Sequence, residues 1–261
     1  MKKFVVLILI CGLAMGLAIT SWAAVNPGVE GETYYCSFPL TVVLDGNLDD
    51  AAWSIASWHG DIIQRETLTG SADADIMFAA VADMEWLYVA IKVSDDKIQM
   101  GENVGGDVWQ DDSVEVYIDA NNGGTEAYDA DDVQITIGAD NIGGDIDNPK
   151  LGGSGGGPDT GTKAAVVKTS TGWDVEAAVP LKNNKWDIKI ADGLTIGFNV
   201  HLNDDDDGAG RDHKLIWSKK DPDDRSWTSS APYGDLIFAG PVTSVSTKGK
   251  VATAWGMIKS E

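Results

Sequence analysis

The chain has 261 residues and a formal net charge of −22 at pH 7, with 41 acidic residues against 19 basic ones. Such an excess of acid disfavours partners that carry many phosphates, so we expect neither nucleic acid nor an anionic lipid surface as a ligand. Cations and neutral molecules remain as the expected partners.

The first residues have the pattern of a secretory signal peptide. Lys2 and Lys3 precede an apolar run that extends to Ile19, and small residues follow it. We therefore expect residues 1–23 to be removed, and the protein to be secreted, periplasmic or on the cell surface. The alternative is a retained membrane anchor, for which the apolar run is short.

Removal of this segment takes two lysines and no acid from the chain, so the formal charge changes from −22 to −24. About 238 residues remain, which suits one all-β domain. Cys36 is then the single cysteine, so no intramolecular disulfide can form. An exported domain without a disulfide needs another stabilising link, and its many aspartates suggest bound calcium. The alternative explanation of the acidity is solubility alone.

Stretches with strand-like composition recur along the chain, separated by turns rich in glycine, aspartate and asparagine. The expected strands are residues 41–45, 75–82, 86–93, 113–119, 133–138, 163–169, 173–179, 194–203, 214–218 and 235–239. Only residues 49–57 and 183–188 resemble short helical turns. About ten strands with turns between them predict an all-β fold, an antiparallel, jelly-roll-like β-sandwich over residues 24–240.

Two segments lack the strand pattern. Residues 152–157 are rich in glycine, but they lack the ending and the following helix of a phosphate-binding loop, so we expect a flexible surface loop. Residues 241–261 form a tail that is separable from the sandwich. This tail is either a sorting or anchoring signal or a frayed terminus. Contact with a membrane is expected only through it or through the signal segment.

The segment from Trp109 to Asp119 is the most informative part of the chain. Its strand has one apolar and one polar face, and Glu115 lies on the polar face. Trp109 and Trp227 both lie in polar loops, where tryptophan more often serves as a ligand platform than as core. Polar groups beside an aromatic plate suit a ligand such as a sugar ring. The tryptophans expected in the core are Trp53, Trp86 and Trp173.

Acidic residues flank the ends of several expected strands, where their oxygens can collect around a calcium ion. The candidate calcium ligands are Asp95, Asp111, Asp112, Asp131 and Asp132. Residues 203–208 resemble the start of an EF-hand loop, but Lys214 occupies the position of the bidentate glutamate, so that interpretation fails. A different calcium site and a solvated acidic turn both remain open.

Catalytic machinery is not visible in the sequence. The three histidines lack metal-binding spacing, and neither a Gly-x-Ser-x-Gly element nor a Cys-x-x-Cys pair occurs. Glycoside hydrolysis needs two facing carboxylates, but among 41 acids some pair always qualifies. We therefore expect a protein that is not an enzyme.

The order and spacing of several motifs resemble family 9 carbohydrate-binding modules over nearly the whole mature domain. The matching stretches are residues 44–53, 85–95, 109–119, 131–134, 172–180, 196–204 and 232–236. The resemblance implies a calcium-containing β-sandwich that binds oligo- or polysaccharides without cleaving them. A role in polysaccharide catabolism would then come through partner enzymes.

The resemblance also implies roles for single residues. Trp109 and Trp227 match two tryptophans that clamp a sugar, and Glu115 matches a glutamate that forms hydrogen bonds with its hydroxyls. Two positions depart from the family pattern, because His201 replaces a glutamine and Thr136 replaces an arginine. Arg225 is the expected substitute for that arginine. The expected carbohydrate-binding residues are Trp109, Glu115, Trp227, His201, Thr136 and Arg225.

Three other functions are alternatives. A structural or surface-assembly protein would keep the sandwich, lose the sugar site and self-assemble; the tail favours it. A haem-binding redox domain of related fold needs axial ligands in an apolar pocket, for which Met77, Met84 and Met100 are available. A hydrolase is the third alternative.

Overall fold

A computed structural model describes residues 33–60, 62–67, 73–103 and 105–241. The expected signal segment and nearly all of the 241–261 tail lie outside the described residues. No helix within the described residues is long and apolar enough to cross a membrane.

Strands dominate the described part of the chain. The strands are β1 (Thr33–Ser37), β2 (Ile63–Thr67), β3 (Asp75–Ala82), β4 (Trp86–Ser94), β5 (Ser113–Asp119), β6 (Asp132–Gly138), β7 (Leu151–Gly152), β8 (Lys163–Lys168), β9 (Gly172–Pro180), β10 (Thr195–Asp204), β11 (His213–Ile216) and β12 (Gly234–Ala239). The helices are α1 (Ala51–Ile55) and the 3-10 helices η1 (Gly105–Gln110), η2 (Ala139–Asn141) and η3 (Gly157–Asp159).

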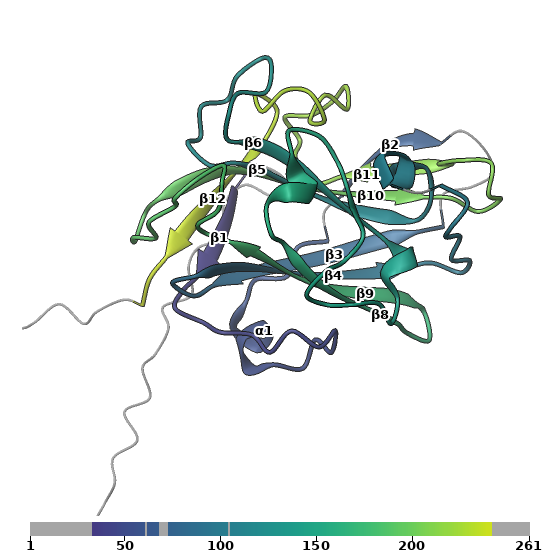
Figure 1. Cartoon of the computed structure of the whole chain (residues 1–261), viewed down its shortest axis with the longest axis horizontal. Helices are drawn as coiled ribbons and strands as arrows, with labels where there is room; N and C mark the ends of the chain where they lie inside the picture. The colour runs from purple at the N-terminus through teal and green to yellow at the C-terminus, as the bar shows by residue number, and fades with distance from the viewer. Residues whose placement is uncertain (1–32, 61, 68–72, 104, 242–261) are drawn as a thin grey trace, which may run out of the picture. The chain divides into compact units, whose positions relative to one another are not determined.

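All described strands belong to one hydrogen-bonded sheet that curls into two layers (Figure 1). Its order is β7-β6-β5-β10-β12-β1-β3-β4-β9-β8, and β11 and β2 extend from β10. β1 connects the layers, because it pairs in parallel with β12 on one side and with β3 on the other. The remaining pairs of described strands are antiparallel, so the expected all-β sandwich is confirmed, with β1 as the departure from a purely antiparallel arrangement.

The main core lies between the layers because the strands alternate in polarity. On β5 the apolar residues Val114, Val116 and Ile118 are buried in this core, together with Trp173 and Trp217. Burying one such side chain contributes about 1.5–3 kcal/mol to stability. The expected core position of Trp173 is confirmed.

A second, smaller core lies on the outer face of β3, β4 and β9, under α1 (Figure 1). Trp53 of α1 is buried there, as expected, and Trp86 packs against this core while staying partly exposed. The Trp53 indole donates a hydrogen bond to the buried carboxylate of Glu176, at 2.7 Å. The backbone amides of Asp45 and Gly46 donate to the same carboxylate, so Glu176 fixes the segment before α1.

Two sequence expectations about local structure are wrong. Residues 41–45 do not form a strand. Val42 is buried and Val43 is 68% exposed, but this alternation arises because Val42 packs into the second core, and the segment pairs with no described strand. Residues 183–188 form no helical turn, because Lys182 and Asp187 pair in an isolated antiparallel bridge.

Candidate functional site

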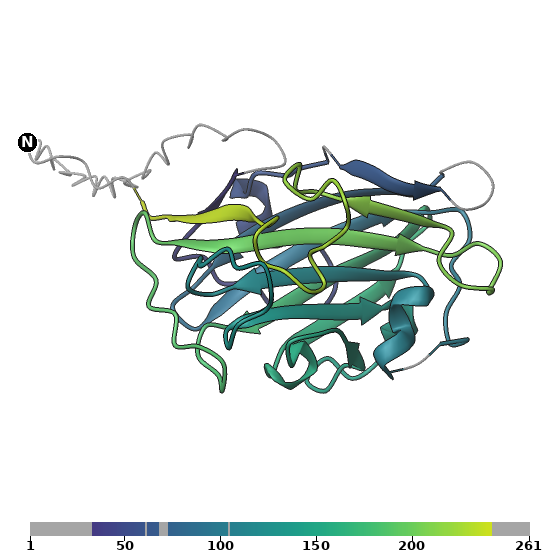
Figure 2. The same cartoon turned by 90° about the horizontal axis from the view of Figure 1, so that it is seen from above.

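One face of the layer made by β6, β5, β10 and β11 is polar. Glu115 lies at its centre, paired in register with Thr136 on β6 and with His201 on β10. Lys214 pairs with Asn203 at the next strand edge. Figure 2 shows this layer from above, with loops crossing over the strands. Since these loops cover the polar face, its side chains are buried although they point away from the apolar core.

The loops leave a pocket of about 540 Å³ over this face. Trp109 in η1 and Trp227 in the loop between β11 and β12 line it, and they are 38% and 53% exposed. The two tryptophans that the sequence set apart from the core therefore meet at one cavity. The pocket is lined by Gly106, Trp109, Glu115, Gln134, Thr136, Gly153, Ser154, Arg211, Lys214, Asp223, Asp224 and Trp227.

The glycine-rich segment 152–157 is part of this pocket and packs closely on β6. The Gln134 backbone amide donates to the Ser154 carbonyl at 3.1 Å. A Cβ atom at Gly153 or Gly157 would lie 2.0 Å or 1.8 Å from the Gln134 carbonyl oxygen. The expectation of a flexible surface loop is thus wrong, because these glycines permit a close approach of two backbones.

Glu115 is an ionised carboxylate held on several sides. Its Oε1 accepts from Gln134 Nε2 at 2.9 Å, and its Oε2 accepts from the Tyr117 hydroxyl at 2.5 Å and from Lys214 Nζ at 2.9 Å. Burial alone would raise the pKa of Glu115, but the charge of Lys214 with the His201 and Tyr117 contacts holds it well below its usual range.

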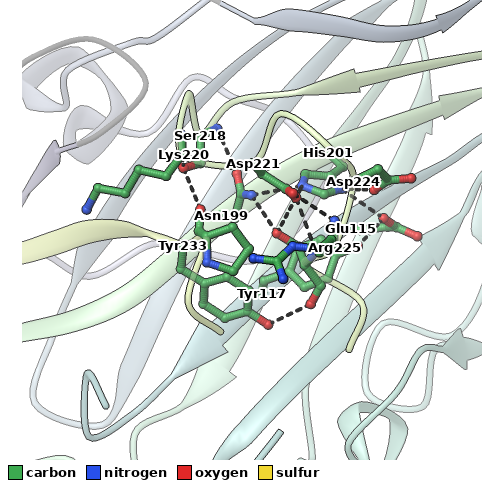
Figure 3. A network of polar contacts seen from close by, with 12 residues as sticks. Glu115, Tyr117, Asn199, His201, Ser218, Lys220, Asp221, Asp224, Arg225 and Tyr233 are labelled. Atoms are coloured by element: carbon green, nitrogen blue, oxygen red, sulfur yellow. Dashed lines mark hydrogen bonds and ion pairs between the residues drawn. The ribbon is translucent and has the colours of Figure 1, made fainter. Parts of the chain in front are cut away.

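His201 is fully buried behind Glu115 and does not line the pocket (Figure 3). The side-chain Oδ1 of Asn199 accepts hydrogen bonds from the backbone amides of Val200 and Ser218, so Asn199 Nδ2 is the donor to His201 Nε2, at 2.9 Å. The neutral ring then carries its proton on Nδ1, which lies 3.3 Å from Glu115 Oε2. Burial lowers the pKa of His201 against the opposing effect of Glu115. His201 is therefore placed to orient Glu115.

The two expected replacements for the family arginine lie in different places. Thr136 lines the pocket, and its buried hydroxyl has no hydrogen-bond partner among the described residues. Arg225 is half-exposed, pairs with Glu126 at 3.0 Å and is not among the residues that line the pocket.

Two cations that the sequence did not point to line the pocket instead. The guanidinium carbon of Arg211 lies 5.1 Å from the centre of the Trp109 ring, and its Nη1 donates to Asn203 at 3.1 Å. Lys214 is buried on β11. The alternation of β11 could have indicated Lys214, since it pairs with a polar-face residue of β10. Arg211 lies in the loop of residues 205–212, where the sequence has no periodic pattern that indicates which way a side chain points.

A separate cluster of carboxylates joins the ends of three strands. Oxygens of Asp95, Asp112 and Asp204 lie within 4.8 Å of one another, and all three residues are buried. Burial raises the pKa of Asp112 to about 9 and that of Asp204 to about 6. Asp95 Oδ2 is buried without a hydrogen-bond partner among the described residues. Calcium prefers oxygen ligands, and these carboxylates lie close together with no cation of the described residues among them, so the cluster fits a calcium ion.

The five candidate calcium ligands do not all converge. Asp95 and Asp112 share the cluster, which also contains Asp204, one of the acids of segment 203–208, for which the sequence leaves a calcium site open. Asp111 accepts from the Gly101 and Asn103 amides and closes that loop. The other two candidates lie elsewhere, at the start of β6 and just before it. Asp131 accepts from Asn121 Nδ2, and Asp132 accepts from the Ser230 hydroxyl.

The methionines considered as haem ligands lie on the surface. Met77, Met84 and Met100 are 43%, 62% and 46% exposed. Their exposure does not match the buried axial ligand that the haem alternative requires.

The sandwich and its loop-walled pocket define a binding module built on a β-sheet face. Residues 44–240 match the family described as carbohydrate family 9 binding domain-like, and the chain belongs to that family. The expected family membership is thus confirmed, and this is a family of binding domains.

Curated relatives carry a similar segment within longer enzymes. Exoglucanase XynX of Acetivibrio thermocellus is 31% identical over 209 residues, which are 80% of this chain and 17% of that protein. Endo-1,4-beta-xylanase A of Thermotoga maritima is 31% identical over 198 residues, 75% of this chain and 17% of that enzyme. The match therefore spans about a sixth of each relative.

Solved structures share the fold. A family 9 carbohydrate-binding module from Caldicellulosiruptor kristjanssonii in complex with glucose superposes with a TM-score of 0.64 at 22% identity, covering 82% of this chain and 100% of the module. The same kind of module in complex with cellotriose gives a TM-score of 0.62 at 22% identity, over 82% and 99% of the two chains. At this identity the likeness establishes the fold.

Proposed function

We propose that this domain binds a saccharide in the pocket between Trp109 and Trp227, without cleaving it. The observation that carries the proposal is that the two exposed loop tryptophans line one pocket whose floor is polar. A sugar ring has weakly apolar C–H faces and polar hydroxyls around its rim. Aromatic plates can cover the faces while fixed polar groups satisfy the hydroxyls.

The polar floor would supply the hydroxyl partners. Glu115 is an acceptor whose position is fixed by its neighbours, and the Thr136 hydroxyl is without a partner among the described residues. Lys214 Nζ donates one hydrogen bond to Glu115, and an ammonium has three protons to donate. His201 would act as a positioning residue, because it contacts Glu115 from behind.

The first experiment is titration calorimetry with glucose and cello-oligosaccharides, the ligands of the two solved modules. Trp109→Ala should weaken binding by on the order of 1–3 kcal/mol, because it removes one aromatic plate. Trp86→Phe is the matched control, since Trp86 lies on β4 in the other layer. It should leave the affinity unchanged.

Two results would count against the proposal. One is the absence of binding to every member of a broad panel of neutral and charged glycans. The other is full affinity in a folded Trp109→Ala variant, which would place the ligand elsewhere on the molecule.

We further propose that Asp95, Asp112 and Asp204 hold a structural calcium ion. The ion would balance two of the three negative charges of carboxylates that are buried close together. It would thereby connect the end of β4 to the start of β5 and the end of β10, two strands of the layer that carries the pocket. None of the three aspartates lines the pocket.

We also propose that the domain acts outside the cytoplasm, alongside glycoside hydrolases. The support is the signal-like segment 1–23 and the enzymes in which relatives of this domain occur. N-terminal sequencing of protein recovered from the culture medium or periplasm should show a new terminus after Ala23. An intact Met1 in exported protein would contradict removal of the segment.

A further inference from the structure

The saccharide pocket contains five charged side chains, and their pairing is uneven. Three carboxylates line it, Glu115, Asp223 and Asp224, against the two cations Arg211 and Lys214. Lys214 Nζ lies 2.9 Å from Glu115 Oε2 and 3.4 Å from Asp224 Oδ1. Arg211 Nη2 lies 3.9 Å from Asp224 Oδ2. Asp224 is thus the carboxylate that both cations share.

The backbone holds Asp224 in this shared position. Its φ of 50° lies in the left-handed region, which aspartate and asparagine tolerate better than most other residues. The side chain is only 16% exposed, and Figure 3 shows it beside His201 at the edge of the buried network. The same loop carries Trp227 three residues later, so the charge of Asp224 is fixed next to one wall of the pocket.

We propose that Asp224 sets the charge selectivity of the pocket, so that the site takes neutral sugars and rejects sugars that carry a carboxylate. This inference rests on the proposed saccharide function. Asp224 lies within ion-pair distance of both cations that a uronic acid would otherwise use, and three carboxylates against two cations leave the lining with one negative charge in excess. A ligand carboxylate would have to displace an existing ion pair and lose its own hydration.

Neutral ligands meet no such obstacle. Sugar hydroxyls both donate and accept hydrogen bonds, so they can interact with carboxylates, an ammonium and the Thr136 hydroxyl without changing the charge balance. The net charge of −22 for the whole chain adds a long-range repulsion against acidic glycans. Salt screens this long-range part, whereas the pairs inside the pocket are screened much less.

The test compares glucose with glucuronate, two sugars that differ by a carboxylate at C6, using titration calorimetry on the full-length protein. The wild-type protein should bind glucose at least roughly tenfold more tightly than glucuronate, because like charges oppose the acid. Asp224→Asn keeps the side-chain shape and tolerates the same backbone. It should reduce that preference roughly tenfold, mainly by strengthening glucuronate binding.

Two further variants separate Asp224 from a general charge effect. Asp223→Asn removes the same charge from the same lining, but Asp223 forms no ion pair with the described side chains, so the preference should change less. Arg211→Gln should shift the preference in the opposite direction, toward still weaker glucuronate binding. This variant also keeps the proposal testable if Asp224→Asn does not fold.

The outcomes distinguish the two proposals. If the wild-type protein binds neither sugar nor any longer glycan, the saccharide function itself is wrong. If it binds glucuronate as tightly as glucose, or if folded Asp224→Asn keeps the wild-type preference, only the charge-selectivity proposal is overturned.

Discussion

Glu115 and Lys214 form an ion pair that is almost completely buried at the floor of the pocket, with side-chain exposures of 1% and 3%. A buried pair of this kind contributes little net stability, because desolvation offsets the attraction. Removing one partner is costly, since it leaves the other charge buried and unpaired. The pair therefore fixes the geometry of the binding surface more than it stabilises the fold.

Lys214→Met should lower the free energy of unfolding by about 3–5 kcal/mol, measured by chemical denaturation, because it leaves the Glu115 carboxylate buried without its cation. The double variant Lys214→Met with Glu115→Gln should recover part of that loss. Lys150→Met is the control, since Lys150 is 75% exposed in its pair with Asp140. A loss no larger for Lys214→Met than for Lys150→Met would contradict the buried-pair interpretation.

Single residues could be assigned from sequence where a strand fixed their direction or where their neighbours were distinctive. Glu115 was found because β5 alternates strictly, and Trp109 and Trp227 because their neighbours are polar. Arg211 was missed, and Arg225 was expected in the pocket, because direction within an irregular loop depends on tertiary contacts that have no sequence period. Which charged side chains of a loop point into the pocket can therefore be determined only from the structure.

At the scale of elements, the pocket is a set of loops laid over a regular sheet. The bounds of β3 and β5 were predicted to the residue, because polar residues typical of turns flank both ends of each strand. β1 was missed, since its five residues contain two adjacent tyrosines and its parallel pairing is not encoded locally. The close packing of segment 152–157 was missed because glycine has no side chain whose polarity would indicate in the sequence that the segment is packed.

Gly157→Ala should destabilise the domain by about 1–3 kcal/mol, because the new Cβ would overlap the Gln134 carbonyl and force a backbone shift. Gly106→Ala is the matched control. Its Cβ would meet nothing within 4 Å, and it also lines the pocket. Thermal unfolding of the two variants gives the comparison. Equal melting temperatures would mean that segment 152–157 moves away from β6 at no cost.

On the scale of the whole molecule, three of the 41 acidic residues, Asp95, Asp112 and Asp204, are buried in one cluster that joins three strands. Burial raises the pKa of Asp112 from 3.8 to about 9. A carboxyl whose pKa is raised in the folded state contributes stability below its ordinary pKa, and that contribution is lost as the pH rises through the raised value. Above that range the fold needs another source of positive charge at this cluster.

Calcium should therefore raise the melting temperature, by roughly 5–10 °C at a hundredfold excess over its dissociation constant. The gain should be larger at about pH 8 than at about pH 5, because protons and calcium compete for the same carboxylates. Asp112→Asn should reduce the response. Asp145→Asn, in an exposed turn outside the cluster, is the control. An equal response to calcium and chelator at both pH values would contradict a cation site here.

The position of β1 has a mechanical consequence. Thr33 pairs with Asp235 at one end of the β1–β12 ladder, and Ser37 pairs with Ala239 at the other. Because the two strands are parallel, a force pulling on residues before Thr33 and after Ala239 loads the ladder along its length. Such a force must shear all the backbone bonds of the ladder together, instead of opening them one at a time. Tension between the two ends should therefore meet high resistance in single-molecule pulling.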